Sequence, residues 1–136
     1  MKNFEILAHT ADVRLKIYGA SQEEVFKNAL KGMTEILKPQ IFDPASENWR
    51  EIKIQSVDLP ALLVDFLSEV LYLSQVNKEI YEEIDILSLT ETEFKGKIKG
   101  RKIESFGEDI KAATYHENYF KQNPDGTWES LIIFDI

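Results

Sequence analysis

Two aspartates near opposite ends of the chain are the first candidates for chemistry. Asp12 interrupts a run of strand-forming residues, and Asp135 comes immediately before Ile136, the last residue. An α-carboxylate on Ile136 would stand beside that of Asp135, and neighbouring carboxylates repel each other unless a cation or a donor lies between them. Together with Asp12 they would supply three oxygen donors, a set that suits calcium or magnesium better than zinc.

Each of these groups also has an ordinary structural interpretation. An aspartate in a turn or bulge often accepts hydrogen bonds from nearby backbone N–H groups, which would account for Asp12. Residues at a chain end are often poorly ordered, which would leave Asp135 and Ile136 without a role. The spacing alone does not choose between a metal site and these structural roles.

Two groups of basic residues are candidates for binding. Lys111 lies in an otherwise apolar stretch, where it is either a point charge for phosphate or an edge-strand lysine that discourages aggregation. Other cations alternate with small and apolar residues and would share one face of a strand; they are Lys95, Lys97, Lys99 and Arg101. This basic row is either a docking surface for a partner or RNA, or a solvated sheet face neutralised by acidic neighbours.

Several chemistries are excluded or disfavoured. The chain has no cysteine, so disulfides, thiolate catalysis and zinc–sulfur sites are excluded. Its two histidines, His9 and His116, are isolated in the sequence, and such histidines are more often structural than catalytic. Neither a glycine-rich phosphate loop nor a G-x-S-x-G nucleophile motif is present.

The first candidate aspartate lies between two predicted strands. Residues 4–8 form a short apolar strand, and residues 13–18 alternate between apolar and polar side chains, which is typical of a half-buried strand. Ser21 followed three residues later by Glu24 has the spacing of a capping box and predicts the start of a helix that ends at Pro39.

The rest of the chain predicts a second helix and five strands. After a loop at 41–48 and a strand at 49–57, Asp58 is a good N-cap for a helix that tolerates Pro60 in its first turn. A broad apolar stripe predicts that this helix is largely buried. The predicted elements after it are a hairpin of strands 79–90 and 93–103, a strand at 110–119, a turn at 123–126 and a strand at 128–136.

Length and composition favour a single α+β domain. The 136 residues, 43% of them hydrophobic, are enough for one domain, 1–136, with its own core. The order β-β-α-β-α-β-β-β-β predicts a mostly antiparallel sheet with two helices packed on one face. A net charge of -8 argues against tight nonspecific binding to DNA or RNA. With no apolar run of about 20 residues and no secretion signal, a soluble cytoplasmic protein is expected.

At this point four segments, in order and spread over essentially the whole chain, carry a resemblance to a known family. They are His-Thr-Ala-Asp-Val at 9–13, Leu-Val-Asp-Phe-Leu-Ser-Glu-Val-Leu-Tyr-Leu at 63–73, Lys-Ala-Ala-Thr-Tyr-His at 111–116 and Ile-Ile-Phe-Asp-Ile at 132–136. On these segments the sequence resembles the archease family, whose fold is α+β. It departs from the family at Arg14, where glycine is usual, and this puts the approach of a partner in doubt.

The resemblance implies an accessory function without enzymatic activity. Archeases act with the GTP-dependent RtcB-type RNA ligase that joins tRNA halves. They speed guanylylation of the ligase, allow its multiple turnover and can broaden its nucleotide choice, so RNA is reached only through the ligase. The implied ligands of a divalent metal, calcium or alternatively magnesium, are Asp12, Asp135 and the carboxylate of Ile136, and Lys111 matches a lysine linked to activity. A general chaperone or modulator of RNA-modifying enzymes is the alternative.

Overall fold

The computed structural model describes residues 2–8, 11–41 and 47–136. Two helices and antiparallel strands are present, so the predicted α+β class is confirmed. The elements are β1 (Phe4–Ala8), β2 (Asp12–Gly19), α1 (Gln22–Leu37), β3 (Pro39–Ile41), β4 (Asn48–Gln55), α2 (Leu59–Asn77), β5 (Glu79–Leu89), β6 (Glu93–Phe106), β7 (Ala112–Gln122) and β8 (Trp128–Asp135).

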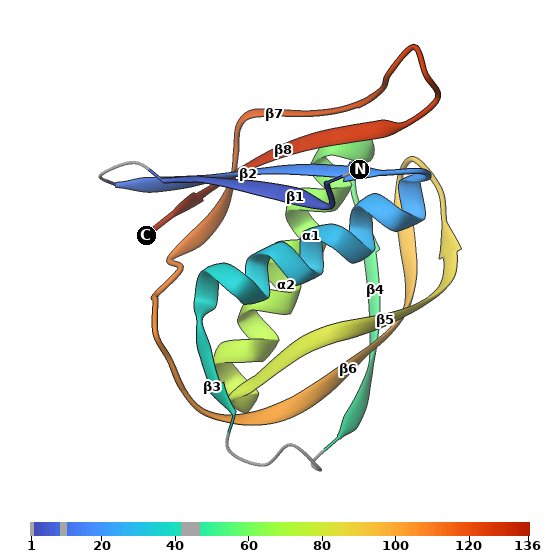
Figure 1. The fold of residues 1–136 in the computed structure, drawn as a ribbon. Helices are drawn as coiled ribbons and strands as arrows, with labels where there is room; N and C mark the ends of the chain where they lie inside the picture. The colour runs from blue at the N-terminus through green and yellow to red at the C-terminus, as the bar shows by residue number, and fades with distance from the viewer. Residues whose placement is uncertain (1, 9–10, 42–46) are drawn as a thin grey trace.

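The strands form two sheets with the helices between them (Figure 1). The first sheet has the order β1-β2-β8-β7, and in the second sheet β6 pairs with β3, β4 and β5. Helix α1 contacts both β2 and β5, and α2 contacts β7 as well as β4 and β5. The first sheet therefore carries the two helices on one face, as predicted. The second sheet packs on the opposite side of the helices.

Local sequence signals fix the start of each helix. Ser21 Oγ accepts a hydrogen bond of 3.1 Å from the Glu24 N–H, and Asp58 Oδ1 accepts one of 2.9 Å from the Ala61 N–H. These contacts confirm the predicted N-caps. Both helices end at a lysine in the left-handed region, Lys38 with φ 48° and Lys78 with φ 51°.

The predicted loop at 41–48 is wrong at both of its ends. Ile41 belongs to β3 and Asn48 begins β4, while residues 42–46 lie outside the described part of the chain. The strand β3 was not predicted because it is only 3 residues long and begins at Pro39, a residue that more often ends a helix. It pairs with the far end of β6 and so extends the second sheet.

One hydrophobic core joins the two sheets through the helices. Phe26 of α1, Phe66 of α2 and Phe94 of β6 form an aromatic cluster, with ring centroids 5.4 Å apart for the first two and 4.7 Å for the last two. Helix α2 is long and apolar enough to span a membrane by length and composition alone. More than half of that stretch is buried inside the protein, which is the pattern of a core helix between two sheets.

Candidate functional site

Asp12 and Asp135 face each other across the pair of β2 and β8. The register places them directly opposite, and the next pair inward is Val13 with Phe134. Val13 and Phe134 are buried in the core, so the two aspartates lie on the face of the sheet that points away from the helices. Residues directly opposite in an antiparallel pair have Cβ atoms about 4.5–5.5 Å apart.

Ile136 and Lys111 join the aspartates through backbone hydrogen bonds. The Ile136 N–H donates to the Ala11 carbonyl at 3.3 Å, so the chain continues along the start of β2 after β8 ends. The Lys111 N–H donates to the Asp135 carbonyl at 2.8 Å on the other side of β8. The structure therefore brings together the backbones of Asp12, Asp135, Ile136 and Lys111, the four residues that the family resemblance implied, at the end of the first sheet where β8 finishes (Figure 1).

Lys111 lies just outside the strand in which it was expected. Strand β7 begins at Ala112, two residues after the predicted start, and is an edge strand of the first sheet. The Lys111 side chain is exposed. It borders a small hollow between α2 and β7 that Ser68, Tyr72 and Gln75 also line. An exposed ammonium group here can approach an anionic partner without breaking any contact in the core.

Asp12 has the properties expected of a cation ligand. Its Oδ1 atom is buried and accepts no hydrogen bond within the part of the chain that the structure describes. A buried oxygen of this kind is costly unless a donor or a cation satisfies it. Among residues 2–8, 11–41 and 47–136, no group of three or more histidine, cysteine, aspartate and glutamate side chains is placed to hold a metal. The two opposed aspartates offer oxygen donors of the kind that a hard cation takes together with water or partner oxygens.

A bulge in β7 adds a further charged residue to this face. Thr114 pairs with Ile133 and Tyr119 with Leu131, so four residues of β7 lie opposite the single Ile132 of β8. In this bulge Glu117 has a φ of 52°, and its carboxylate forms an ion pair with Nη1 of Arg14 at 2.8 Å. Neither residue could be assigned this role from sequence, because a bulge breaks the alternation from which strand faces are predicted.

The same bulge contacts the second helix. Tyr115 donates a short hydrogen bond from its hydroxyl group to Asp65 Oδ1 of α2. This bond, with burial as a smaller cause, raises the pKa of Tyr115 above its usual value. Asp65 therefore helps to hold the bulge in place. His116 of the bulge is exposed, and His9 lies outside the described residues.

The basic row lies on the outer face of the second sheet, as its alternation predicts. Its cations have acidic neighbours, because Lys99 contacts Glu47 at 3.1 Å and Glu83 at 3.5 Å. The other contacts are Lys95 with Glu93 at 3.5 Å and Arg101 with Glu82 at 3.7 Å. In the strand register Lys97 stands between Glu51 and Asp85.

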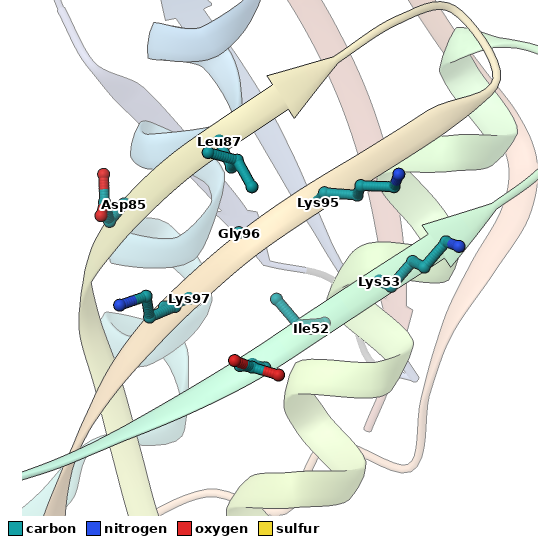
Figure 2. Close-up of a pocket in the computed structure, with 8 residues that line it drawn as sticks. Ile52, Lys53, Asp85, Leu87, Lys95, Gly96 and Lys97 are labelled. Atoms are coloured by element: carbon teal, nitrogen blue, oxygen red, sulfur yellow. The ribbon is translucent and has the colours of Figure 1, made fainter.

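A shallow hollow over Gly96 lies in the middle of this row. Figure 2 shows Lys95 and Lys97 of β6 on either side of the glycine, with Lys53 on the neighbouring β4. Lys53 and Lys95 are directly opposite each other, which is an unfavourable arrangement of like charges. Taken together, the row is mostly neutralised by carboxylates and has one local excess of positive charge.

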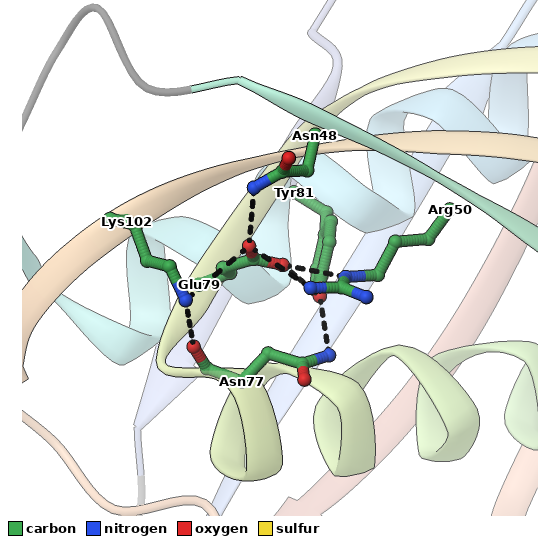
Figure 3. Close-up of polar contacts among 6 residues, drawn as sticks. All are labelled: Asn48, Arg50, Asn77, Glu79, Tyr81 and Lys102. Carbon is green, nitrogen blue, oxygen red and sulfur yellow. Dashed lines mark hydrogen bonds and ion pairs between the residues drawn. The ribbon is translucent and has the colours of Figure 1, made fainter.

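A second cluster of ionisable groups is buried at the start of β5 (Figure 3). Glu79 is fully buried, and its carboxylate accepts hydrogen bonds from Arg50 at 2.8 and 3.2 Å, Tyr81 at 2.7 Å and Asn48 at 3.2 Å, with Lys102 at 3.8 Å. Burial alone would raise the pKa of Glu79, but these hydrogen bonds outweigh it and lower the pKa below its usual value. The donors satisfy the carboxylate, so the cluster stabilises the fold.

Comparison with known proteins assigns the chain to a family. The model of the Archease protein family matches residues 4–136. An archease of Methanosarcina barkeri is 34% identical over 99% of this chain and 97% of its own length. An archease of Pyrococcus abyssi is 29% identical over the full length of both proteins.

Solved structures agree in fold. The solution structure of a protein from Methanobacterium thermoautotrophicum covers all of both chains, with a TM-score of 0.73 and 27% identity. A crystal structure from Thermotoga maritima, described as an archease and possible chaperone, covers 96% of this chain and 94% of its own, with a TM-score of 0.69. Its 23% identity supports the fold alone. On the match of the family model and the Methanosarcina relative, the chain belongs to the archease family.

Proposed function

We propose that this protein is an accessory activator of a GTP-dependent RtcB-type RNA ligase and has no catalytic activity of its own. It promotes attachment of GMP to the ligase's active-site histidine, allows multiple turnover and broadens the choice of nucleotide. Membership of the archease family supports this proposal at the level of the whole chain. The observation that carries it is the gathering of Asp12, Asp135 and Lys111 at one end of a sheet.

In this proposal Asp12, Asp135 and the carboxylate of Ile136 hold a divalent cation. Calcium suits this set of oxygen donors best, and magnesium is the alternative. The bound cation would supply positive charge that neutralises an anionic group of the partner. The buried Oδ1 of Asp12, which has no hydrogen-bond partner among the described residues, supports such a role, because a cation would satisfy it.

The protein's own contribution is positioning. Asp12 and Asp135 lie on paired strands of a sheet packed on the core, so their separation is fixed before a partner binds. Lys111 adds an exposed positive charge that can approach a triphosphate. Fixed charges that need no rearrangement favour phosphoryl and nucleotidyl transfer, in which orientation and charge neutralisation are the main demands.

The decisive experiment is multiple-turnover ligation by the cognate ligase with GTP, with and without this protein. Asp12→Asn keeps the shape of the side chain and removes its charge, and Glu91→Gln at an exposed hairpin tip of the second sheet is a control with the same charge change. We expect stimulation by the wild type and Glu91→Gln, and little or none by Asp12→Asn. A folded Asp12→Asn protein that stimulates normally would remove the carboxylate pair from the mechanism.

A chaperone function is the second candidate. The Thermotoga maritima structure is described as a possible chaperone, and in this chain Val57 and Leu87 are 84% and 82% exposed. Exposed apolar side chains can bind unfolded clients. Suppression of aggregation of an unrelated client, unaffected by Asp12→Asn and lost in Val57→Ser with Leu87→Ser, would favour this function over ligase activation.

A further inference from the structure

We propose that Arg14 and Glu117 form a positioning pair that sets how strongly the carboxylates at this end of the first sheet bind a cation. The proposal rests on the cation site described under the proposed function. Glu117 holds the Arg14 guanidinium and neutralises it, so that Arg14 does not compete with the cation for Asp12. Both residues act through Asp12 and are not themselves proposed as ligands.

Arg14 is close enough to Asp12 to pair with it. The two residues are on the same face of β2, separated by one residue, so their Cα atoms are about 7 Å apart. An arginine can span such a distance, and an arginine–carboxylate contact is among the strongest hydrogen-bonded pairs. Asp12 Oδ1 nevertheless has no hydrogen-bond partner among the described residues, whereas Arg14 Nη1 lies 2.8 Å from Glu117 Oε2. The guanidinium is therefore held by Glu117 of the bulge and not by Asp12.

The bulge presents Glu117 independently of Arg14. Glu117 has a φ of 52° and lies in the left-handed region, so its side chain does not point in the direction expected at this position of a regular strand. Thr114 Oγ1 donates to the Ile133 carbonyl at 2.9 Å before the bulge, and Tyr115 bonds to Asp65 within it. These contacts hold the bulge without help from the ion pair, so removing the charge of Glu117 should leave its backbone in place.

Loss of Glu117 should weaken cation binding in two ways. An unneutralised positive charge about 7 Å from a divalent cation lowers the affinity for the cation about sevenfold in a water-like dielectric without salt, and less at physiological ionic strength. In addition, a guanidinium without Glu117 can turn to Asp12 and must be displaced before a cation binds. The second effect requires Arg14, so it distinguishes a positioning pair from two independent surface charges.

Calcium titration calorimetry on the full chain tests the pair. The variants are Glu117→Gln, Arg14→Gln and the double variant. Glu91→Gln and Lys16→Gln are matched controls for charge, since Glu91 is exposed at a distant hairpin tip and Lys16 lies on the same face of β2, one step farther from Asp12. We expect Glu117→Gln to raise the Kd about three- to tenfold when Arg14 is present, and by a clearly smaller factor in the Arg14→Gln background, where only the loss of the Glu117 charge itself remains. Melting temperatures establish that each variant is folded.

Three results would overturn the inference in distinguishable ways. An equal effect of Glu117→Gln in both backgrounds would mean that the two charges act independently. An unchanged Kd in Glu117→Gln, with binding still abolished by Asp12→Asn, would remove the positioning pair and leave the cation site intact. A wild type that binds calcium no better than Asp12→Asn would remove both the inference and the cation site beneath it.

Discussion

Asp12 lies directly opposite Asp135 on neighbouring antiparallel strands, with no basic side chain between them in the strand register. Like charges in this arrangement destabilise a sheet. The backbone of Ile136, the residue after Asp135, also bonds to the start of the other strand, because its N–H donates to the carbonyl of Ala11. An arrangement that is unfavourable on its own becomes favourable when a cation is bound, and this relation gives the first prediction.

Asp12→Asn should separate intrinsic stability from cation-linked stability. In a chelator we expect the variant to be as stable as the wild type or more stable by about 0.2–1 kcal/mol, because the repulsion with Asp135 is gone. Calcium at about 100 times its Kd should stabilise the wild type by about 2.7 kcal/mol and the variant hardly at all. Thermal unfolding with and without calcium measures both effects, and Asp85→Asn should respond to calcium as the wild type does.

Glu79→Gln should destabilise the protein by about 2–3 kcal/mol, because it leaves Arg50 and Lys102 without their buried carboxylate. Since the folded-state pKa of Glu79 lies below its ordinary value of 4.5, the ionised form is the one that stabilises the fold. Its contribution is fully present above the unfolded pKa and is lost as the pH falls through the folded one.

Urea unfolding from pH 7 down to about pH 3 measures this contribution. The curves of wild type and Glu79→Gln should converge as the pH drops below 4.5, the ordinary value. Glu83→Gln is the control, since Glu83 is an exposed partner of Lys99 and should change stability by no more than about 0.5 kcal/mol at any pH. A gap between wild type and Glu79→Gln that stays constant with pH would contradict the role of the ionised carboxylate.

The parts of the fold that depend on neighbouring residues could be predicted from the sequence. Alternation in 13–18 predicted β2, and the cap residues Ser21 and Asp58 predicted where each helix begins. These signals depend on a few neighbouring residues, so they can be recognised without knowledge of the tertiary structure. The short β3 carries too few residues for such a pattern.

The parts of the site that depend on distant pairing could not be derived in this way. The register of Asp12 with Asp135 joins the two ends of the chain, and only the family resemblance favoured a shared site over separate structural roles for these residues. The pairing of Arg14 with Glu117 depends on a bulge that breaks the strand period. The sequence around Glu79 is that of an ordinary polar strand residue. Its buried role could not be predicted, because the groups that donate to it come from three strands, β4, β5 and β6.

The basic row is expected to affect docking of the ligase more than its activation. Lys97→Glu should raise the concentration of this protein needed for half-maximal stimulation about threefold at low salt, since exposed charges act mainly on encounter. Maximal stimulation should not change. Lys27→Glu on the exposed side of α1 is the matched control. Equal half-maximal concentrations for wild type and Lys97→Glu would mean that the row is a solvated face only.

Lys111→Ala should change maximal stimulation and leave the half-maximal concentration the same, the reverse of the result expected for Lys97→Glu. Its backbone N–H is bonded to the Asp135 carbonyl and its side chain is exposed, so removal of the ammonium group should lower maximal stimulation by about tenfold or more and leave calcium affinity unchanged or slightly tighter. Ligation assays at saturating activator, together with calcium titration, measure both. Lys111→Arg should retain part of the stimulation, because it keeps the charge but changes the geometry of the donor. If Lys111→Ala instead abolished calcium binding with stimulation lost in parallel, Lys111 would act by maintaining the cation site and not by contacting the ligase.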